Sequence, residues 1–173
     1  MLPENLMRGV YSIPICEKGQ ILLLPLNPED RGKVERVGKN KKTLQPEKML
    51  GVVSGGIETW RGVEETPAQA IIRECYEETG IYLAEWQVLQ DLRDIQVYQF
   101  RGGVHKEIIG HGKHVHLTVQ QIEKAKRKRG IIPLQFEVSE GLQFLKKHGR
   151  DLRPSTYAAL LQYLSHQETR YAI

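Results

Sequence analysis

The stretch ETPAQAIIRECYEETGI, residues 65–81, decides the fold, because it is the clearest helix in the chain and carries an unusual set of charges. Thr66 suits the N-cap of a helix, a proline follows at the first helical position, and Gln69 completes a capping box. Gly80 is a natural stop after the last turn. These signals predict a helix over residues 66–79.

Three glutamates of this helix, Glu74, Glu77 and Glu78, lie close together in the sequence. At about 100° per residue they share one arc of the helix, and the apolar residues share another. Like charges at this spacing repel each other, so something must offset the cost. Arg73 can pair with one carboxylate, and either solvent or a bound divalent cation would serve the others. The expected buried face consists of Ala68, Ile71, Ile72, Cys75 and Thr79.

The sequence in front of the helix favours a cation over a solvated acidic face. A predicted strand over 49–56 ends in Gly55 and Gly56, whose backbone can approach a ligand closely, and Glu65 precedes the helix. Mg²⁺ prefers oxygen ligands and is commonly shared between protein carboxylates and substrate phosphates. The succession of strand, glycine pair, glutamate and capped helix therefore predicts a divalent-cation site.

These residues resemble the signature of the Nudix hydrolase family. Glu65, seven further residues and the segment RECYEETGI over 73–81 match the family pattern without a gap. The signature glycine corresponds to Gly56, but eight residues rather than the usual five separate it from Glu65. The loop before the helix is therefore longer than in the family pattern, and it contains Trp60 and Arg61.

The resemblance implies an α/β fold, namely an α/β/α sandwich with a mixed β-sheet, formed as one Nudix domain over residues 1–173. It also implies divalent-cation-dependent hydrolysis of a diphosphate linked to another group, with Mg²⁺ or Mn²⁺ as the cofactor. Carried over by position, Glu74, Glu77 and Glu78 would be catalytic and would bind the metal, and the Gly55 carbonyl would be an additional ligand.

The resemblance gives Arg73 and Glu65 supporting roles in the same site. Arg73 would orient a carboxylate, and Glu65 is its expected partner. A carboxylate can also accept the proton of an attacking water, which makes it a general base. Glu74 or Glu77 on the helix is the favoured base. The later alternatives are Glu107 and Glu123.

The substrate is less firmly indicated than the reaction. Tyr98 follows the motif at the distance typical of family members that act on dinucleoside polyphosphates, although a tyrosine in a strand is also ordinary packing. Trp60, Arg61 and Tyr98 are predicted to contact substrate, and Phe100 is a further candidate to stack on a base. The favoured substrate is a dinucleoside polyphosphate or a nucleoside triphosphate. Two alternatives stay open: an RNA 5′-pyrophosphohydrolase, and a non-catalytic Nudix-fold module that binds nucleotides.

The rest of the chain shows a mixture of strands and helices, as expected for an α/β or α+β domain. Strands are predicted over 10–17, 20–26, 49–56 and 114–120, and 85–100 is predicted to form one bent strand or two. Helices are predicted over 139–149 and 154–167, with a shorter one over 121–129. Loops are predicted over 27–48, 57–65 and 101–113.

The net charge of +4 and the pI of about 9.0 are compatible with phosphate-bearing ligands. Two basic clusters, 31–42 and 124–129, are either solvated surface or contacts for phosphate or an RNA 5′ end. Neither cluster contains interleaved aromatic residues, which weakens the nucleic-acid interpretation. The segment 105–116 contains four histidines, and His114 and His116 would share a strand face that is either plainly polar or able to bind zinc.

The two cysteines, Cys16 and Cys75, suggest a reducing compartment rather than a disulfide framework. No apolar run approaches the roughly 20 residues of a membrane span, and the N-terminus lacks the pattern of a signal peptide. We therefore expect a soluble cytoplasmic protein with no membrane partner. The sequence leaves the oligomeric state open, a dimer included.

Overall fold

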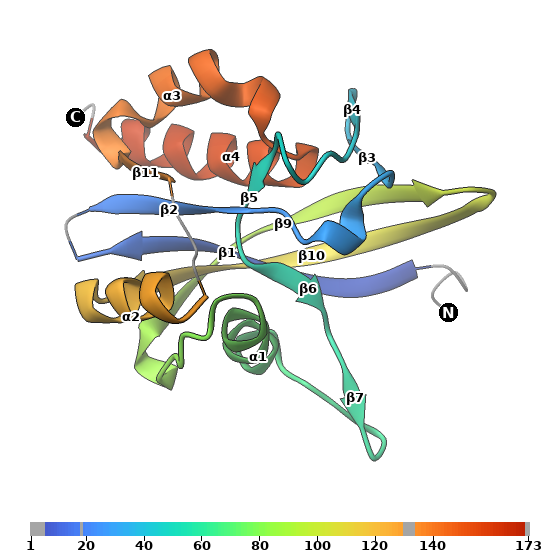
Figure 1. Ribbon diagram of the computed structural model, residues 1–173, viewed down its shortest axis with the longest axis horizontal. Helices are drawn as coiled ribbons and strands as arrows, with labels where there is room; N and C mark the ends of the chain where they lie inside the picture. The colour runs from blue at the N-terminus through green and yellow to red at the C-terminus, as the bar shows by residue number, and fades with distance from the viewer. Residues whose placement is uncertain (1–5, 18, 130–133, 172–173) are drawn as a thin grey trace.

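The computed structural model describes residues 6–17, 19–129 and 134–171. A mixed β-sheet forms the central layer, with α1 (Pro67–Thr79) and α2 (Val119–Arg129) on one face and α3 (Gly141–His148) and α4 (Pro154–Tyr171) on the other (Figure 1). This arrangement confirms the predicted α/β fold with a mixed sheet. In the described part of the chain, no helix is both long and apolar enough to cross a membrane.

The sheet has the strand order β11-β2-β1-β10-β9-β3-β4, with β5 beside β2 and β6 beside β1. Strands β1 and β10 run parallel, and the other neighbouring strands of the described sheet pair antiparallel. A separate hairpin is formed by β7 and β8. The strands are β1 (Leu6–Cys16), β2 (Gln20–Pro25), β3 (Val34–Val37), β4 (Asn40–Thr43), β5 (Leu50–Gly51), β6 (Ser54–Gly56), β7 (Thr59–Trp60), β8 (Val63–Glu64), β9 (Val88–Arg101), β10 (Val104–Leu117) and β11 (Leu134–Glu137).

Two apolar clusters, one on each face of the sheet, hold these layers together. Because side chains alternate along a strand, Tyr11 and Ile13 of β1 pack toward α3 and α4, whereas Val10 packs toward α1. On α1, Ile71 and Cys75 are buried as predicted. The helix is rotated slightly from the expected arc, because Ala70 rather than Ala68 is fully buried.

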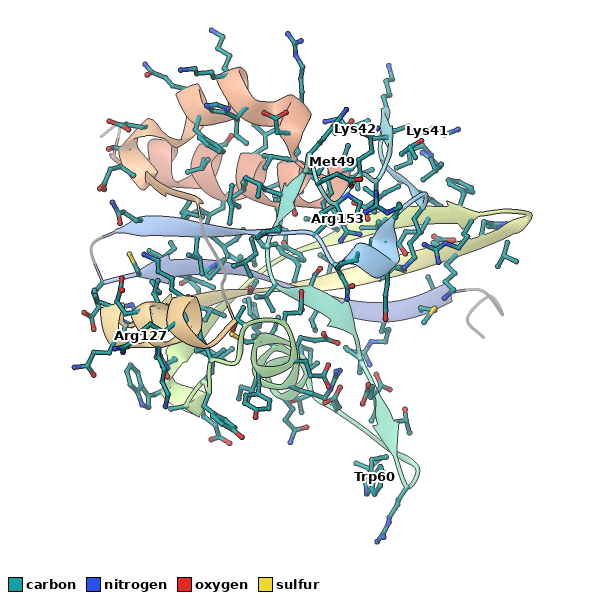
Figure 2. All side chains as sticks on the ribbon, in the orientation of Figure 1. Lys41, Lys42, Met49, Trp60, Arg127 and Arg153 are labelled. Atoms are coloured by element: carbon teal, nitrogen blue, oxygen red, sulfur yellow. The ribbon has the colours of Figure 1, made fainter. Side chains whose placement is uncertain are left out.

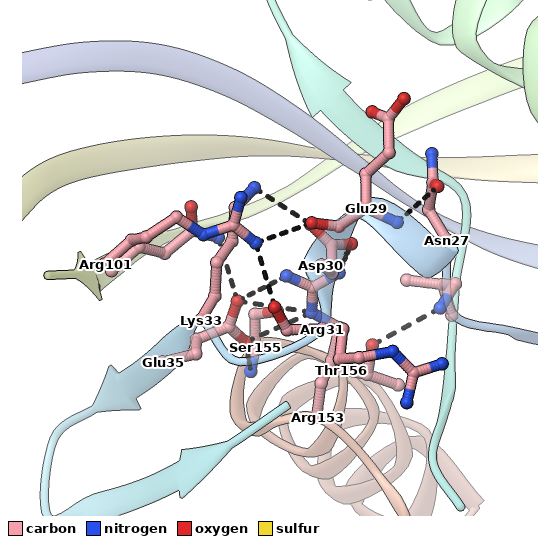
Figure 3. Close-up of polar contacts among 12 residues, drawn as sticks. Asn27, Glu29, Asp30, Arg31, Lys33, Glu35, Arg101, Arg153, Ser155 and Thr156 are labelled. Atoms are coloured by element: carbon pink, nitrogen blue, oxygen red, sulfur yellow. Dashed lines mark hydrogen bonds and ion pairs between the residues drawn. The ribbon is translucent and has the colours of Figure 1, made fainter. Parts of the chain in front are cut away.

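The prediction of a loop over 27–48 is wrong in part, because this segment contains the hairpin of β3 and β4. The buried position of β3 is occupied by a carboxylate, Glu35, rather than by an apolar residue, and this hides the alternation. Arg153, before α4, donates to Glu35 at 2.6 Å, and the backbone N–H of Ser155 donates at 2.8 Å (Figure 3). Burial acts to raise the pKa of Glu35, but these two donors hold it below its ordinary value.

The predictions of loops over 57–65 and 101–113 are also wrong in part, because both segments contain strands. The first contains the β7–β8 hairpin, whose turn residues Arg61 and Gly62 both have positive φ, as a type I′ turn requires. The second contains most of β10, which pairs with β9. Gly112 obscured this strand in the sequence, and the glycine is needed because a Cβ atom there would overlap the Tyr11 ring.

The other sequence predictions agree better with the structure. The segment 85–100 forms one long strand, β9, after a short 3-10 turn, and its pairing with β10 is interrupted by register shifts. The short helix predicted over 121–129 is present as α2, and the two C-terminal helices are present as α3 and α4.

Candidate metal centre

Helix α1, which carries the three carboxylates, begins with a capping box. The backbone N–H of Thr66 donates to Gln69 Oε1 at 2.9 Å, and the N–H of Gln69 donates to Thr66 Oγ1 at 3.2 Å. Gly80 ends the helix in the left-handed region, with φ of 76°. Since both ends are capped and one face is buried against the sheet, the direction of each side chain is set by the sequence of the helix.

Arg73 lies at the centre of a group of carboxylates. Its Nε and Nη2 donate to the two oxygens of Glu65 at 2.9 and 2.8 Å, which is the bidentate geometry of a strong pair. Its Nη1 donates to Glu74 at 2.8 Å and to Glu77 at 3.2 Å, and its Nη2 also donates to the Gly56 carbonyl at 2.7 Å. The expected pairing of Arg73 with Glu65 is thus present, and it lowers the pKa of Glu65.

Glu74 and Glu78 lie against the glycine strand β6. A Cβ atom on Gly55 would overlap the Glu74 carboxylate, so only glycine leaves room for it. Glu78 shares a hydrogen bond with Glu74 and accepts another from the backbone of Ser54. Burial, together with the neighbouring charge of Glu74, raises the pKa of Glu78 to about 9. In the described structure, Glu78 Oε2 is buried and has no hydrogen-bond partner.

These features fit a hard divalent cation. A buried carboxylate oxygen without a partner is costly, and a cation would satisfy it. The donors are all oxygens, the type that Mg²⁺ and Mn²⁺ prefer. Glu74 and Glu78 contact each other directly, whereas the half-exposed Glu77 is joined to Glu74 through Arg73 Nη1, which binds both carboxylates. Accordingly, no three histidine, cysteine or acidic side chains among the described residues form a preassembled cation site.

The three residues predicted to contact substrate lie on separate elements. Trp60 is 72% exposed at the tip of the β7–β8 hairpin, which projects from the body of the molecule (Figure 2). Arg61 lies next to it, with its guanidinium carbon 5.6 Å from the centre of the Trp60 ring system. Tyr98 lies within the sheet on β9, where the guanidinium of Arg36 covers its ring at 4.2 Å.

The remaining residues considered from the sequence have other partners. Glu107 accepts a hydrogen bond from Gln96 on β9, and Glu123 pairs with Lys126 on the exposed side of α2. The ring of His114 packs edge-on against Tyr163 of α4, and burial lowers its pKa.

Two contacts near the site were not predicted from the sequence. The Glu58 carboxylate lies 3.5 Å from Arg73 Nη1, and its backbone N–H donates to Glu65 at 2.8 Å. Arg8 on β1 forms an ion pair with Glu64, beside Glu65. The pairing of β7 with β8 places Glu58 opposite Glu65, so recognising this hairpin would have found Glu58. Nothing local in the sequence marks Arg8.

Comparison with known proteins points to one family. A family model described as the NUDIX domain matches residues 8–146. A crystal structure of a MutT protein from Methanosarcina mazei Go1 matches with 14% identity, covering 97% of this chain and 99% of that one, with a TM-score of 0.57. A mutT/nudix family protein from Listeria innocua matches with 17% identity, 99% of both chains and a TM-score of 0.57.

A third solved structure, a NUDIX hydrolase from Nitrosomonas europaea, has 17% identity, covers 92% of this chain and 89% of that one, and gives a TM-score of 0.53. No curated protein matches the sequence. At these identities the structural matches show a shared fold, whereas the family model covers most of the chain and includes the glutamate-rich helix.

Proposed function

This chain belongs to the Nudix family and is a hydrolase of phosphoric anhydrides, and from that premise we propose that it is a divalent-cation-dependent pyrophosphohydrolase. Its substrate is a nucleoside di- or polyphosphate derivative, of the dinucleoside polyphosphate or nucleoside triphosphate type. The observation that carries the proposal is the buried pair of Glu74 and Glu78, in which Glu78 Oε2 has no hydrogen-bond partner among the described residues.

In this proposal Glu74 and Glu78 hold Mg²⁺ or Mn²⁺ beside the Gly55 carbonyl, and Glu77 joins them from the exposed side. When bound, the cation screens the charge of the diphosphate, polarises phosphorus and lowers the pKa of a bound water. Glu74 or Glu77 accepts the proton of the attacking water, because both line the polar edge of α1 next to Arg73.

Arg73 and Glu65 keep the carboxylates in place in this proposal. The Arg73 guanidinium binds Glu65 with two hydrogen bonds and still reaches Glu74, so it fixes the carboxylate that faces Gly55. Its bond to the Gly56 carbonyl ties the same group to β6. The extended hairpin places Trp60 and Arg61 beyond this cluster, where an aromatic face and a cation suit the distal part of a nucleotide.

One experiment tests the activity and the site together. The protein is incubated with Mg²⁺ or Mn²⁺ and a panel of nucleoside triphosphates, dinucleoside polyphosphates and 5′-triphosphorylated RNA, and the products are separated by chromatography. We expect metal-dependent cleavage of a diphosphate bond, abolished in Glu78→Gln and retained in the matched surface variant Glu85→Gln. Absence of any metal-dependent product would refute the proposed hydrolase activity. Full activity of Glu78→Gln would refute the assignment of Glu78 to the metal site.

The same panel separates the alternatives. A rate on triphosphorylated RNA far above the rate on mononucleotides identifies an RNA 5′-pyrophosphohydrolase. Nucleotide binding without any turnover identifies a binding module that has kept the fold but not the chemistry.

A further inference from the structure

A group of cationic and aromatic side chains lies at the end of the sheet, on the face that α1 covers further along. Register pairs Arg36 of β3 with Tyr98 of β9 and with Lys41 of β4, and pairs Phe100 of β9 with His105 of β10. Residues paired across strands share a face of the sheet. We call Arg36, Lys41, Tyr98, Phe100 and His105 the sheet-end platform.

The platform faces away from α3 and α4, which cover the opposite face of the sheet. The adjacent positions on β3 and β4, Glu35 and Lys42, point the other way: Glu35 binds Arg153, and Lys42 donates to the carbonyl of Gly149 at 2.9 Å. Figure 1 shows the β9–β10 hairpin extending well beyond α1 and α2, so neither of these helices covers this end of the face. Lys41 and His105 are accordingly exposed, and the two aromatic rings are half exposed.

The cations of the platform are held over aromatic rings. The Arg36 guanidinium carbon lies 4.2 Å from the centre of the Tyr98 ring, and Arg36 Nη1 donates to the Gly38 carbonyl at 2.9 Å. The half-exposed guanidinium is thereby held over the ring. Lys41 Nζ lies 5.7 Å from the centre of Phe100, whose ring in turn approaches that of His105 at 6.2 Å.

The charges of Arg36 and Lys41 are not cancelled by a carboxylate partner among the described residues. In the described structure neither Arg36 nor Lys41 forms an ion pair with a carboxylate. The acidic residue opposite Tyr98, Glu107, accepts a hydrogen bond from Gln96. Toward the candidate metal centre, Asp94 contacts His111, which accepts a hydrogen bond from Arg8. The positive charge therefore remains available to a ligand at the outer end of the sheet.

The platform and the candidate metal centre lie on one continuous sheet. The order from the glycine strand outward is β6, β1, β10, β9, β3 and β4. Neighbouring strands are about 4.8 Å apart, so Gly55 on β6 and Arg36 on β3 are separated by roughly 19 Å in the direction across the strands. The register adds a displacement of four residues along β10, from His111 to Glu107. A ligand that contacts both must be extended and anionic, as a chain of several nucleotides is.

We propose that the sheet-end platform binds single-stranded nucleic acid, with a base stacked on the Arg36 guanidinium and a phosphate near Lys41. Aromatic and guanidinium faces in a cationic groove are the recurrent means by which proteins hold single strands without reading their sequence. The basic cluster over 31–42 lacks aromatics of its own, but the fold supplies them from β9. Placing the 5′-phosphates of this strand at Glu74 and Glu78 rests on the proposed function, whereas binding at the platform does not.

Binding is measured by fluorescence anisotropy, with a labelled 12-nucleotide RNA and the same sequence as DNA, in the Glu78→Gln background so that no turnover occurs. We expect Arg36→Ala/Lys41→Ala to weaken binding at least tenfold and to lower the slope of log affinity against log salt by about 1.4, since two cations are removed. Removing the same charge from α3, in Lys146→Ala/Lys147→Ala, leaves both quantities near those of the parent.

A second variant separates stacking from charge. Arg36→Lys keeps the charge but loses the planar group, so we expect roughly fivefold weaker binding or more with an unchanged salt slope. With these variant effects present, tighter binding of RNA than of DNA identifies RNA as the ligand, and equal binding of both identifies a platform that accepts either strand. An equal loss of oligonucleotide affinity in the α3 variant would overturn the proposed platform. An oligonucleotide affinity no higher than that for a nucleoside triphosphate would also overturn it.

Failure of this inference is distinguishable from failure of the proposed function. Normal cleavage of mononucleotides with no platform-dependent binding of oligonucleotides refutes the platform alone. Platform-dependent binding with no cleavage of any substrate leaves the platform standing and refutes the enzyme. Thermal unfolding followed by circular dichroism checks that each variant is folded, since Lys41 is exposed and Arg36 is half exposed.

Discussion

A Cβ atom at position 55 would occupy the space in which the Glu74 carboxylate lies. The neighbouring Gly56 is different, because a Cβ atom there would meet nothing within 4 Å. The two glycines are adjacent in the sequence, yet only at the first would a side chain collide with the acidic cluster. Gly55 therefore serves the site by close approach of its backbone to a side chain, whereas Gly56 contributes its carbonyl oxygen to Arg73, which an alanine would also supply.

This contrast gives a matched pair of variants. We expect Gly55→Ala to displace Glu74 from β6 and to reduce metal-dependent turnover by tenfold or more, whereas Gly56→Ala keeps most of it. Steady-state kinetics over a range of Mg²⁺ concentrations measures the effect, and thermal unfolding reports the accompanying loss of stability. Equal activities of the two variants would contradict the role given to Gly55.

At the scale of elements, a buried ion pair fastens β3 to the start of α4. Glu35 is fully buried and is bound by Arg153, by the Ser155 backbone and by Gln99 of β9 (Figure 3). Asp30 adds a second carboxylate at 3.3 Å from Arg153. One charged side chain therefore joins two strands and a helix that are distant in sequence, and β3 is also the strand that carries Arg36.

Removing one member of this pair leaves a buried charge without its partner. We expect Glu35→Gln to lower the free energy of unfolding at pH 7 by about 3–5 kcal/mol. The exposed pair on α2 is the control: Lys126→Gln should change it by less than about 0.5 kcal/mol. Urea denaturation followed by circular dichroism measures both.

The effect of Glu35→Gln depends on pH in a defined direction. The pKa of Glu35 is lowered in the folded protein, so its stabilising effect is present above its unfolded pKa of about 4.5 and is lost as the pH falls through the folded value. The difference between wild type and Glu35→Gln should therefore shrink as the pH falls below about 4.5. A difference that stays constant down to pH 3 would contradict this account.

For the molecule as a whole, the sequence predicted the features whose signals are local. Thr66, Gln69 and Gly80 define α1 within one segment, and the same segment carries the acidic cluster. Glu35 was not predictable as a buried residue, because its partner Arg153 lies 118 positions away. The platform was missed for the same reason, since the aromatic rings and the cations meet only after β3 pairs with β9.

Binding of a cation should be visible in the stability of the whole protein. A ligand present at one hundred times its dissociation constant stabilises the folded state by about 2.7 kcal/mol. For a domain of this size that corresponds to roughly 5–10 °C in the unfolding temperature. We expect Mg²⁺ or Mn²⁺ to produce such a shift in the wild type and in Glu85→Gln, but not in Glu78→Gln, as measured by differential scanning calorimetry.

The parallel pairing of β1 with β10, from Leu6↔Glu107 to Cys16↔Leu117, also determines when the protein can fold during synthesis. The ribosome delivers β1 first, and its central partner follows roughly a hundred residues later, which takes on the order of 5–20 s. Until then the apolar side chains of β1, such as Ile13, lack the members of their cluster that lie on β9, α3 and α4. Strand β1 therefore stays exposed to aggregation for longer than a strand whose partner follows directly, and chaperones protect the nascent chain most where β1 lies.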